Sequence, residues 1–147
     1  MLKGNKANKI GAETERIIFE QCVAQGHYAE RQKKHGITIY GTQRHIDIVL
    51  NESIVIEVQA QNVSGTGDQK LVYKIHDAVE LLTTSSYLEY ILVLKGKQLE
   101  ILVPYLKTIL EKIKNSDKVK IRILTFNEFC NWVKFKPSDD YQKLWFG

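Results

Sequence analysis

Ile and Val alternate with polar residues through the middle of the chain, and this alternation predicts two neighbouring β-strands. Residues 45–50 and residues 54–61 both show the period of two that places successive side chains on opposite faces of a sheet. Both segments are rich in the β-branched residues that strands favour. Only the polar residues 51–53 separate them, so we expect an antiparallel hairpin.

Apolar residues recur at helical spacing on both sides of this hairpin. In the first helical segment Ile18 and Cys22 lie on one face, and Gly26 has the position of the glycine that commonly follows a helix. Thr125 and Glu128 have the capping-box spacing at the start of the last helical segment. The predicted helices cover residues 11–25, residues 68–82, a segment opened by Pro104, and residues 126–133.

The order of these elements predicts an α/β protein. Further strands are expected at residues 28–32, 90–94 and 119–124, with an irregular hairpin arm at residues 37–40. Hydrophobic residues make up 44% of the chain and charged residues 26%, as is typical of globular proteins. Because the chain shows no repeat and no linker, we expect one domain over residues 1–147.

Neither a membrane span nor a disulfide framework is expected. No apolar run approaches the roughly 20 residues that a bilayer span needs, and the polar N-terminal segment differs from a signal peptide. We therefore expect a cytoplasmic protein. Cys22 and Cys130 lie in apolar helical patterns and are too few for a disulfide framework, so we expect reduced thiols in or near the core.

The chain is mildly basic. It has 21 Lys and Arg residues against 17 Asp and Glu residues, a formal net charge of +4. This balance by itself barely favours nucleic acid over other partners. Basic residues cluster around residues 31–35 and 107–122, and each cluster is as compatible with a solvated face as with phosphate contacts.

Two carboxylates interrupt the strand pattern. Asp47 lies between two Ile residues, and Glu57 lies between Ile56 and Val58. One explanation is that both residues lie on a solvated face of the hairpin. The other is that they converge from adjacent strands and are compensated by a cation, because an ionised carboxylate is costly to bury alone. Such a pair suits Mg²⁺, and Gln59 leaves the same strand face as Glu57.

The spacing of these residues resembles a known signature. Asp47 is followed ten positions later by the triplet Glu57-Val58-Gln59, which resembles the motif of the PD-(D/E)XK nuclease superfamily. Upstream, residues 11–16 are similar to the Gly-x-x-x-Glu-Arg opening of the first helix in archaeal Holliday-junction resolvases of this superfamily. Downstream, residues 61–73 are similar to a loop and helix start of small restriction-like and homing nucleases of this fold.

The resemblance implies a restriction-endonuclease-like fold, in which helices flank a mixed β-sheet core in an αβββαβ arrangement. It implies that Asp47, Glu57 and the Val58 backbone carbonyl bind Mg²⁺, with Mn²⁺ as a substitute. It also implies that Glu15 assists from the first helix, as a ligand or by holding a water. Glu13 competes with Glu15 for this role, because the two side chains point to different faces of the helix.

Two positions depart from the pattern of the superfamily. Ile46 replaces the Pro of the motif's name, which is variable among members. Gln59 stands where Lys is usual, and an amide lacks the charge that Lys offers to a phosphate. Either Gln59 completes the catalytic set, as in superfamily members that carry Gln there, or Lys70 delivers an ammonium group into the site. We expect the first.

The implied activity is that of a metal-dependent endonuclease that hydrolyses phosphodiester bonds in double-stranded DNA, of the restriction or intron-encoded homing type. Cutting both strands needs two active sites, so a homodimer or higher homo-oligomer is expected, associated with the nucleoid through DNA. The alternatives are a Holliday-junction resolvase-like nuclease and a catalytically decayed DNA-binding protein of the same fold. The residues expected to contact DNA are Arg44, Gln61, Ser64, Gly65, Thr66, Lys70 and Tyr73.

Overall fold

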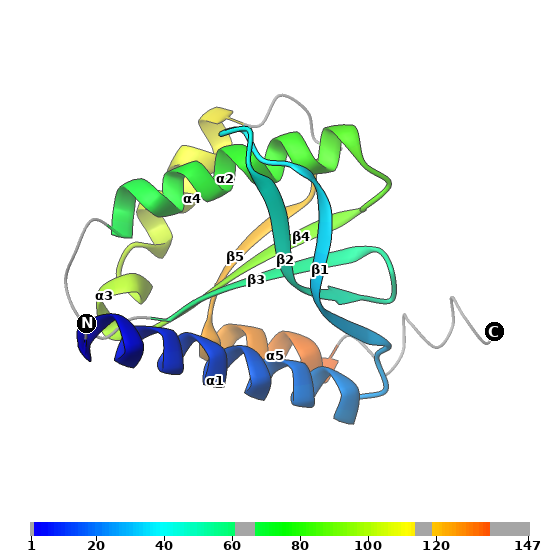
Figure 1. Cartoon of the computed structure of the whole chain (residues 1–147), viewed down its shortest axis with the longest axis vertical. Helices are drawn as coiled ribbons and strands as arrows, with labels where there is room; N and C mark the ends of the chain where they lie inside the picture. Colours follow the sequence, from blue (N-terminus) through cyan, green and yellow to red (C-terminus); the bar gives the residue numbers. More distant parts are fainter. Residues whose placement is uncertain (1, 61–66, 114–118, 136–147) are drawn as a thin grey trace.

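A computed structural model describes residues 2–60, 67–113 and 119–135 of the chain. Figure 1 shows the ten elements that these residues form. In chain order they are α1 (Leu2–Ala24), β1 (Ala29–Ile37), β2 (Gln43–Leu50), β3 (Ile54–Ala60), α2 (Gly67–Thr84), β4 (Glu89–Lys95), α3 (Lys97–Glu100), α4 (Val103–Ile113), β5 (Ile121–Thr125) and α5 (Phe126–Phe135).

The sheet lies between two layers of helices. Its strand order is β1–β2–β3–β4–β5. The pairs β1/β2 and β2/β3 are antiparallel, whereas β3/β4 and β4/β5 are parallel and are connected through helices. Figure 1 shows α2 and α4 on one face of the sheet and α1 and α5 on the other. This mixed sheet between helices confirms the predicted fold class.

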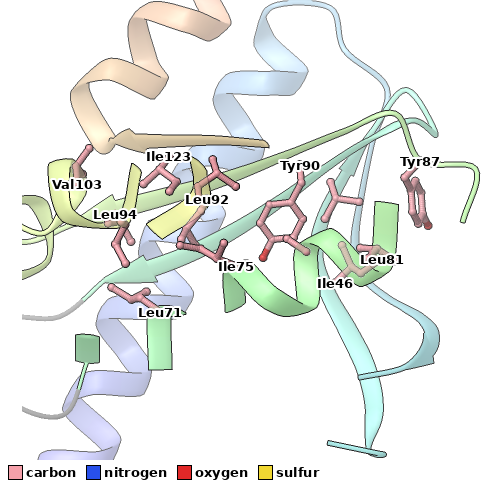
Figure 2. Close-up of a cluster of buried hydrophobic side chains, with 14 of the residues drawn as sticks. Ile46, Leu71, Ile75, Leu81, Tyr87, Tyr90, Leu92, Leu94, Val103 and Ile123 are labelled. Carbon is pink, nitrogen blue, oxygen red and sulfur yellow. The ribbon is translucent and has the colours of Figure 1, made fainter. Parts of the chain in front are cut away.

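Each face of the sheet packs a hydrophobic core of its own. The first core lies under α2 and α4, and Figure 2 shows Ile75 of α2 and Leu92 of β4 within it. The second core joins Ile18 of α1 and Phe129 of α5 to β3. Residues 54–58 of β3 are all buried, and alternation sends successive side chains to the two cores. Burial on both faces holds β3 rigidly between the two helical layers.

The predicted elements are present, and the differences lie where apolar periodicity is weak. Helix α1 begins at Leu2, whereas the prediction begins at residue 11. The first turns of α1 are polar and lack the apolar periodicity on which the prediction depends. Strand β1 extends to Ile37, and its largely exposed residues at the sheet edge show little alternation. The short helix α3 is unpredicted. The capping box of α5 is formed: the Thr125 N–H donates to Glu128 Oε1 at 2.9 Å, and the Glu128 N–H donates to Thr125 Oγ1 at 3.1 Å.

Both cysteines are free thiols, as the sequence predicts. Cys22 is buried in the second core, and Cys130 is half-buried and donates to Gln21 Oε1 at 3.2 Å. Burial raises the pKa of the Cys22 thiol to about 12, so this group stays protonated at neutral pH. None of the described helices combines the length and the apolar character needed to cross a lipid bilayer.

Candidate active site

The sheet forks at the two carboxylates that interrupt the strand pattern. The ladder between β2 and β3 ends at the Ile48–Ile56 pair, and the next positions along the two strands are Asp47 and Glu57. Beyond this point β2 continues along β1, while β3 continues along β4 as far as Ala60. The two strands therefore diverge at the carboxylates and open a space between them.

Hydrogen bonds across the fork hold the two carboxylates in place. The Val58 N–H donates to Asp47 Oδ2 at 2.8 Å, and the Asp47 N–H donates weakly to Glu57 Oε2 at 3.4 Å. Backbone N–H groups that leave a ladder need other acceptors, and here each carboxylate accepts from the opposite strand. The structure thus brings Asp47 and Glu57 together at one point.

The environment of Glu57 opposes its ionisation. The side chain is buried, and burial raises the pKa of this carboxyl well above its ordinary value. The positive charge of Lys74 lowers the pKa, and the neighbouring Asp47 raises it again. Two carboxylates that lie close together and are shielded from solvent repel each other when both are ionised. A bound cation compensates this repulsion and stabilises the ionised pair.

Glu15 reaches the same region from α1. Its side chain is buried, and Oε2 accepts hydrogen bonds from Arg31 Nε at 2.9 Å and Arg31 Nη2 at 2.5 Å. Gln32 Nε2 donates to Oε1 at 2.7 Å. Burial raises the pKa of Glu15, the hydrogen bond from Arg31 lowers it, and the Asp47 carboxylate raises it. Glu15 is therefore a neighbour of Asp47, oriented by two residues of β1.

The structure separates Glu15 from its competitor on the same helix. Glu13 is exposed and lies 3.8 Å from Arg16 on the outer surface of α1. The two residues are two positions apart and so point in different directions on a helix. Of the two, Glu15 is the one that reaches the fork.

The residues at the fork fit a divalent cation. In the part of the chain that the structure describes, no three His, Cys, Asp or Glu side chains form a ready-made metal cage. Mg²⁺ does not need one, because it commonly takes one or two carboxylates and keeps several waters. Asp47 and Glu57 provide that pair of hard oxygen donors, and a cation bound between them would relieve the repulsion between their charges. The Val58 carbonyl stays a predicted third ligand.

Gln59 is half-buried and follows Glu57 on the same face of β3, the face covered by α2. It pairs along the sheet with Leu94 of β4, so its position is fixed by the parallel ladder. The side chain at position 59 therefore leaves the strand next to Glu57, as the sequence predicts.

A pocket of about 230 Å³ opens beside Glu57. The turn between β1 and β2 contributes Thr38 and Tyr40, and α2 contributes Lys70, Tyr73, Lys74 and Asp77. Tyr40 and Tyr73 are exposed and pack edge to face with ring centroids 5.2 Å apart. Three of the residues predicted to contact DNA, Arg44, Lys70 and Tyr73, therefore lie in the wall of a pocket that includes Glu57.

Arg44 has a different environment from the one expected for a DNA contact. It is buried, and its Nε and Nη2 donate to the two carboxylate oxygens of Asp77 at 2.9 and 2.7 Å. Its Nη1 donates to the His35 carbonyl at 3.3 Å. The guanidinium is engaged inside the fold, so Arg44 joins β2 to α2. Its predicted contact with DNA stays a prediction.

The remaining residues predicted to contact DNA lie outside the described part of the chain: Gln61, Ser64, Gly65 and Thr66. Their role stays a prediction.

Four residues near the fork were not predicted from the sequence. Arg31 belongs to a basic cluster that indicated only a charged surface, and Gln32 had no distinguishing pattern. Lys74 follows Lys70 by one helical turn, and this spacing was the available signal. Tyr90 is an apolar strand position in the sequence; Figure 2 shows it within the first core, where burial and then the Glu57 charge raise its pKa.

Comparison with known proteins agrees with this geometry. A family model for the PD-(D/E)XK nuclease superfamily domain matches residues 6–135. No curated protein and no solved structure gives a significant match. Nucleases of this superfamily generally use divalent metal ions. The matched segment includes α1 from residue 6 onward, the forked sheet and the site residues described above, and the chain belongs to the PD-(D/E)XK nuclease superfamily.

Proposed function

We propose that this protein is a Mg²⁺-dependent endonuclease that hydrolyses phosphodiester bonds in double-stranded DNA. The observation that carries the proposal is the convergence of Asp47 and Glu57 at the fork between β2 and β3. Membership of the superfamily supports hydrolysis of nucleic acid, and the choice of duplex DNA is part of the proposal.

The chain's own residues would act by binding and orientation. Asp47 and Glu57 would hold the cation, with the Val58 carbonyl beside them. A bound divalent cation supplies Lewis acidity toward the phosphate and makes a water molecule more nucleophilic. Glu15, fixed by Arg31 and Gln32, would accept a hydrogen bond from the attacking water, and Gln59 would orient a phosphate oxygen.

We further propose a homodimer of the restriction or intron-encoded homing type. Each chain has one fork with one pair of converging carboxylates among its described residues. Cleavage of both strands therefore needs two copies or two successive events.

The first test is the loss of one carboxylate. Glu57→Ala is expected to lower the Mg²⁺-dependent cleavage rate at least about 1,000-fold, which corresponds to about 4 kcal/mol of transition-state stabilisation. Plasmid and genomic DNA are the substrates, and DNA binding is measured separately in Ca²⁺, where it should be retained.

Glu13→Ala is the matched control, because Glu13 is an exposed glutamate on α1 that does not reach the fork. It should cleave at the wild-type rate, whereas Glu15→Ala should be impaired. Wild-type cleavage by the Glu57 variant would show that the fork is not the active site.

Two observations favour alternative functions for this protein. Glu15 lies at the fork, in a segment of α1 whose sequence is similar to the first-helix opening of junction resolvases, which favours branched DNA as a substrate. Gln59 in place of Lys favours a decayed nuclease that binds DNA without cutting it. Supercoiled, linear and four-way-junction DNA assayed side by side distinguish these: preference for the junction indicates a resolvase, and no nicking with Mg²⁺ or Mn²⁺ indicates decay.

A further inference from the structure

One face of α2 lines the pocket beside Glu57. Lys70, Tyr73, Lys74 and Asp77 follow the spacing i, i+3, i+4, i+7, which places them on one side of a helix. The helix buries its neighbouring apolar stripe in the first core, so its position relative to β3 is fixed by packing. The pocket therefore has a rigid wall that carries two ammonium groups.

The two lysines are not equivalent. Lys70 is exposed, whereas Lys74 lies one turn deeper along the helix and is half-buried. Both lysines line the pocket with Glu57, and the positive charge of Lys74 lowers the pKa of that carboxyl. Lys74 is thus the lysine that is partly withdrawn from solvent in the pocket that Glu57 lines.

The acidic residue nearest to Lys74 on this wall is already used. Asp77 follows Lys74 by three positions, but Arg44 occupies both of its carboxylate oxygens. Among the residues that the structure describes, no carboxylate forms an ion pair with Lys74. Its charge is therefore available to a ligand in the pocket.

We propose that Lys74 supplies from α2 the ammonium group that position 59 lacks, and that it contacts the scissile phosphate beside Asp47 and Glu57. The inference rests on the proposed nuclease function and names Lys74 as a further catalytic residue in place of Lys70. Lys74 lines the pocket together with Glu57, and Gln59 leaves β3 on the same face as Glu57, the face that α2 covers. A positive charge there would stabilise the negative charge that develops on the phosphoryl oxygens.

An exchange of the lysine between these two positions tests the proposal. Lys74→Met should lower the single-turnover cleavage rate about 100-fold or more with Mg²⁺. The double variant Lys74→Met, Gln59→Lys should cleave at least about tenfold faster than Lys74→Met, because the new lysine brings the positive charge back into the site from β3. Lys74→Arg, which keeps the charge, should retain more activity than Lys74→Met. Lys134→Met is the matched control, since Lys134 is exposed on α5 in the opposite helical layer (Figure 1).

DNA affinity gives a readout that is independent of cleavage. With Ca²⁺ and a fluorescent duplex, Lys74→Met should reduce the slope of log K against log salt by about one phosphate contact, and Lys134→Met should leave it unchanged. Melting temperatures of all variants establish that they are folded.

The outcomes separate the two proposals. If the wild type cuts DNA and Lys74→Met cuts equally well, or if Lys70→Met causes the loss that Gln59→Lys repairs, the assignment of Lys74 is wrong and the nuclease function stands. If the single variant Gln59→Lys does not cut DNA, the rescue cannot be measured and the salt dependence of DNA binding decides. An unchanged slope for Lys74→Met then overturns the assignment, and a reduced slope supports it. If the wild type cuts no DNA with any divalent cation, the proposed function fails and this inference fails with it.

Discussion

Glu57 is the residue at which folding and the proposed function conflict. Its carboxyl is buried next to Asp47, and burial raises its pKa well above the ordinary value of 4.5. Between the ordinary pKa of the unfolded chain and the raised pKa of the fold, the folded state binds more protons than the unfolded state. The free energy of unfolding therefore falls as the pH rises through this window. Ionisable groups whose burial lowers the stability of the folded state are common at functional sites.

Replacing this carboxyl by its neutral isostere should stabilise the metal-free protein. Glu57→Gln is expected to raise the melting temperature at pH 8 by about 3 °C in EDTA, and to have little effect well below pH 4.5, where the wild-type carboxyl is protonated in both states. Thermal unfolding from about one pH unit below this ordinary pKa up to pH 8 measures this difference. Ca²⁺ should stabilise the wild type and not the variant.

The same experiment can refute this account of Glu57. Equal melting temperatures for wild type and Glu57→Gln at every pH would mean that ionised Glu57 is not disfavoured by the fold.

Gln32 shows how the backbone adapts to the site. Its φ angle is 53°, in the left-handed region that residues other than glycine rarely adopt. It lies between the Arg31–Ile48 and Lys33–Ile46 pairs of the β1/β2 ladder. This conformation accompanies the hydrogen bond from its side chain to Glu15. Neither feature has a sequence signature, because both depend on α1 packing against β1.

At the scale of elements, the turn between β1 and β2 is attached to α2. The carboxylate of Asp77 accepts from the Ile39 N–H at 3.1 Å and from Arg44 of β2, so one side chain joins the turn, the strand and the helix. Asp77 and Arg44 also line the pocket beside Glu57. Arg44, which the sequence predicts to contact DNA, therefore also connects β2 to α2.

Removing the shared acceptor should loosen this attachment. Asp77→Ala leaves the buried Arg44 without its partner, so we expect a loss of about 3 kcal/mol in the free energy of unfolding. Urea denaturation measures the loss. Hydrogen exchange should also accelerate at residues 38–42 more than in β4. His76→Ala, at an exposed position of the same helix, is the control and should change neither quantity.

No selective acceleration at residues 38–42 in the Asp77 variant would contradict the attachment of the turn to α2. A uniform increase in exchange would indicate general destabilisation only.

At the scale of the whole molecule, the described residues provide one fork in each chain. Cleavage of both strands in one binding event then requires two chains on one DNA site. The net charge of +4 alone barely favours DNA, so the proposed association depends on local contacts such as those of the lysines in the pocket. Contacts with phosphates would make this association salt-dependent.

Mixing active and inactive chains tests the dimer. If two copies act together, wild-type protein mixed with excess Glu57→Ala should form heterodimers that cut one strand, and supercoiled plasmid should yield nicked circles in place of linear DNA. Agarose gels measure the ratio of the two products. A ratio that does not respond to the excess of inactive chains would indicate that each chain acts alone.

The sequence by itself determined the strands, the helices longer than α3 and the central pair of acidic residues. A period of two over residues 45–50 and 54–61, with a short turn between them, fixes the register, and that register brings Asp47 opposite Glu57. Helical spacing and a capping box placed α5 in the same way. These features are local, so periodicity and turn length are sufficient to predict them.

Only the tertiary structure decided which side chains surround that pair. The choice of Glu15 over Glu13 depends on how α1 lies against β1, and the engagement of Arg44 by Asp77 depends on where α2 crosses the sheet. The placement of Lys74 beside Glu57 has the same origin. These contacts join residues that are 16 or more positions apart, and local periodicity says nothing about which helix face meets which strand.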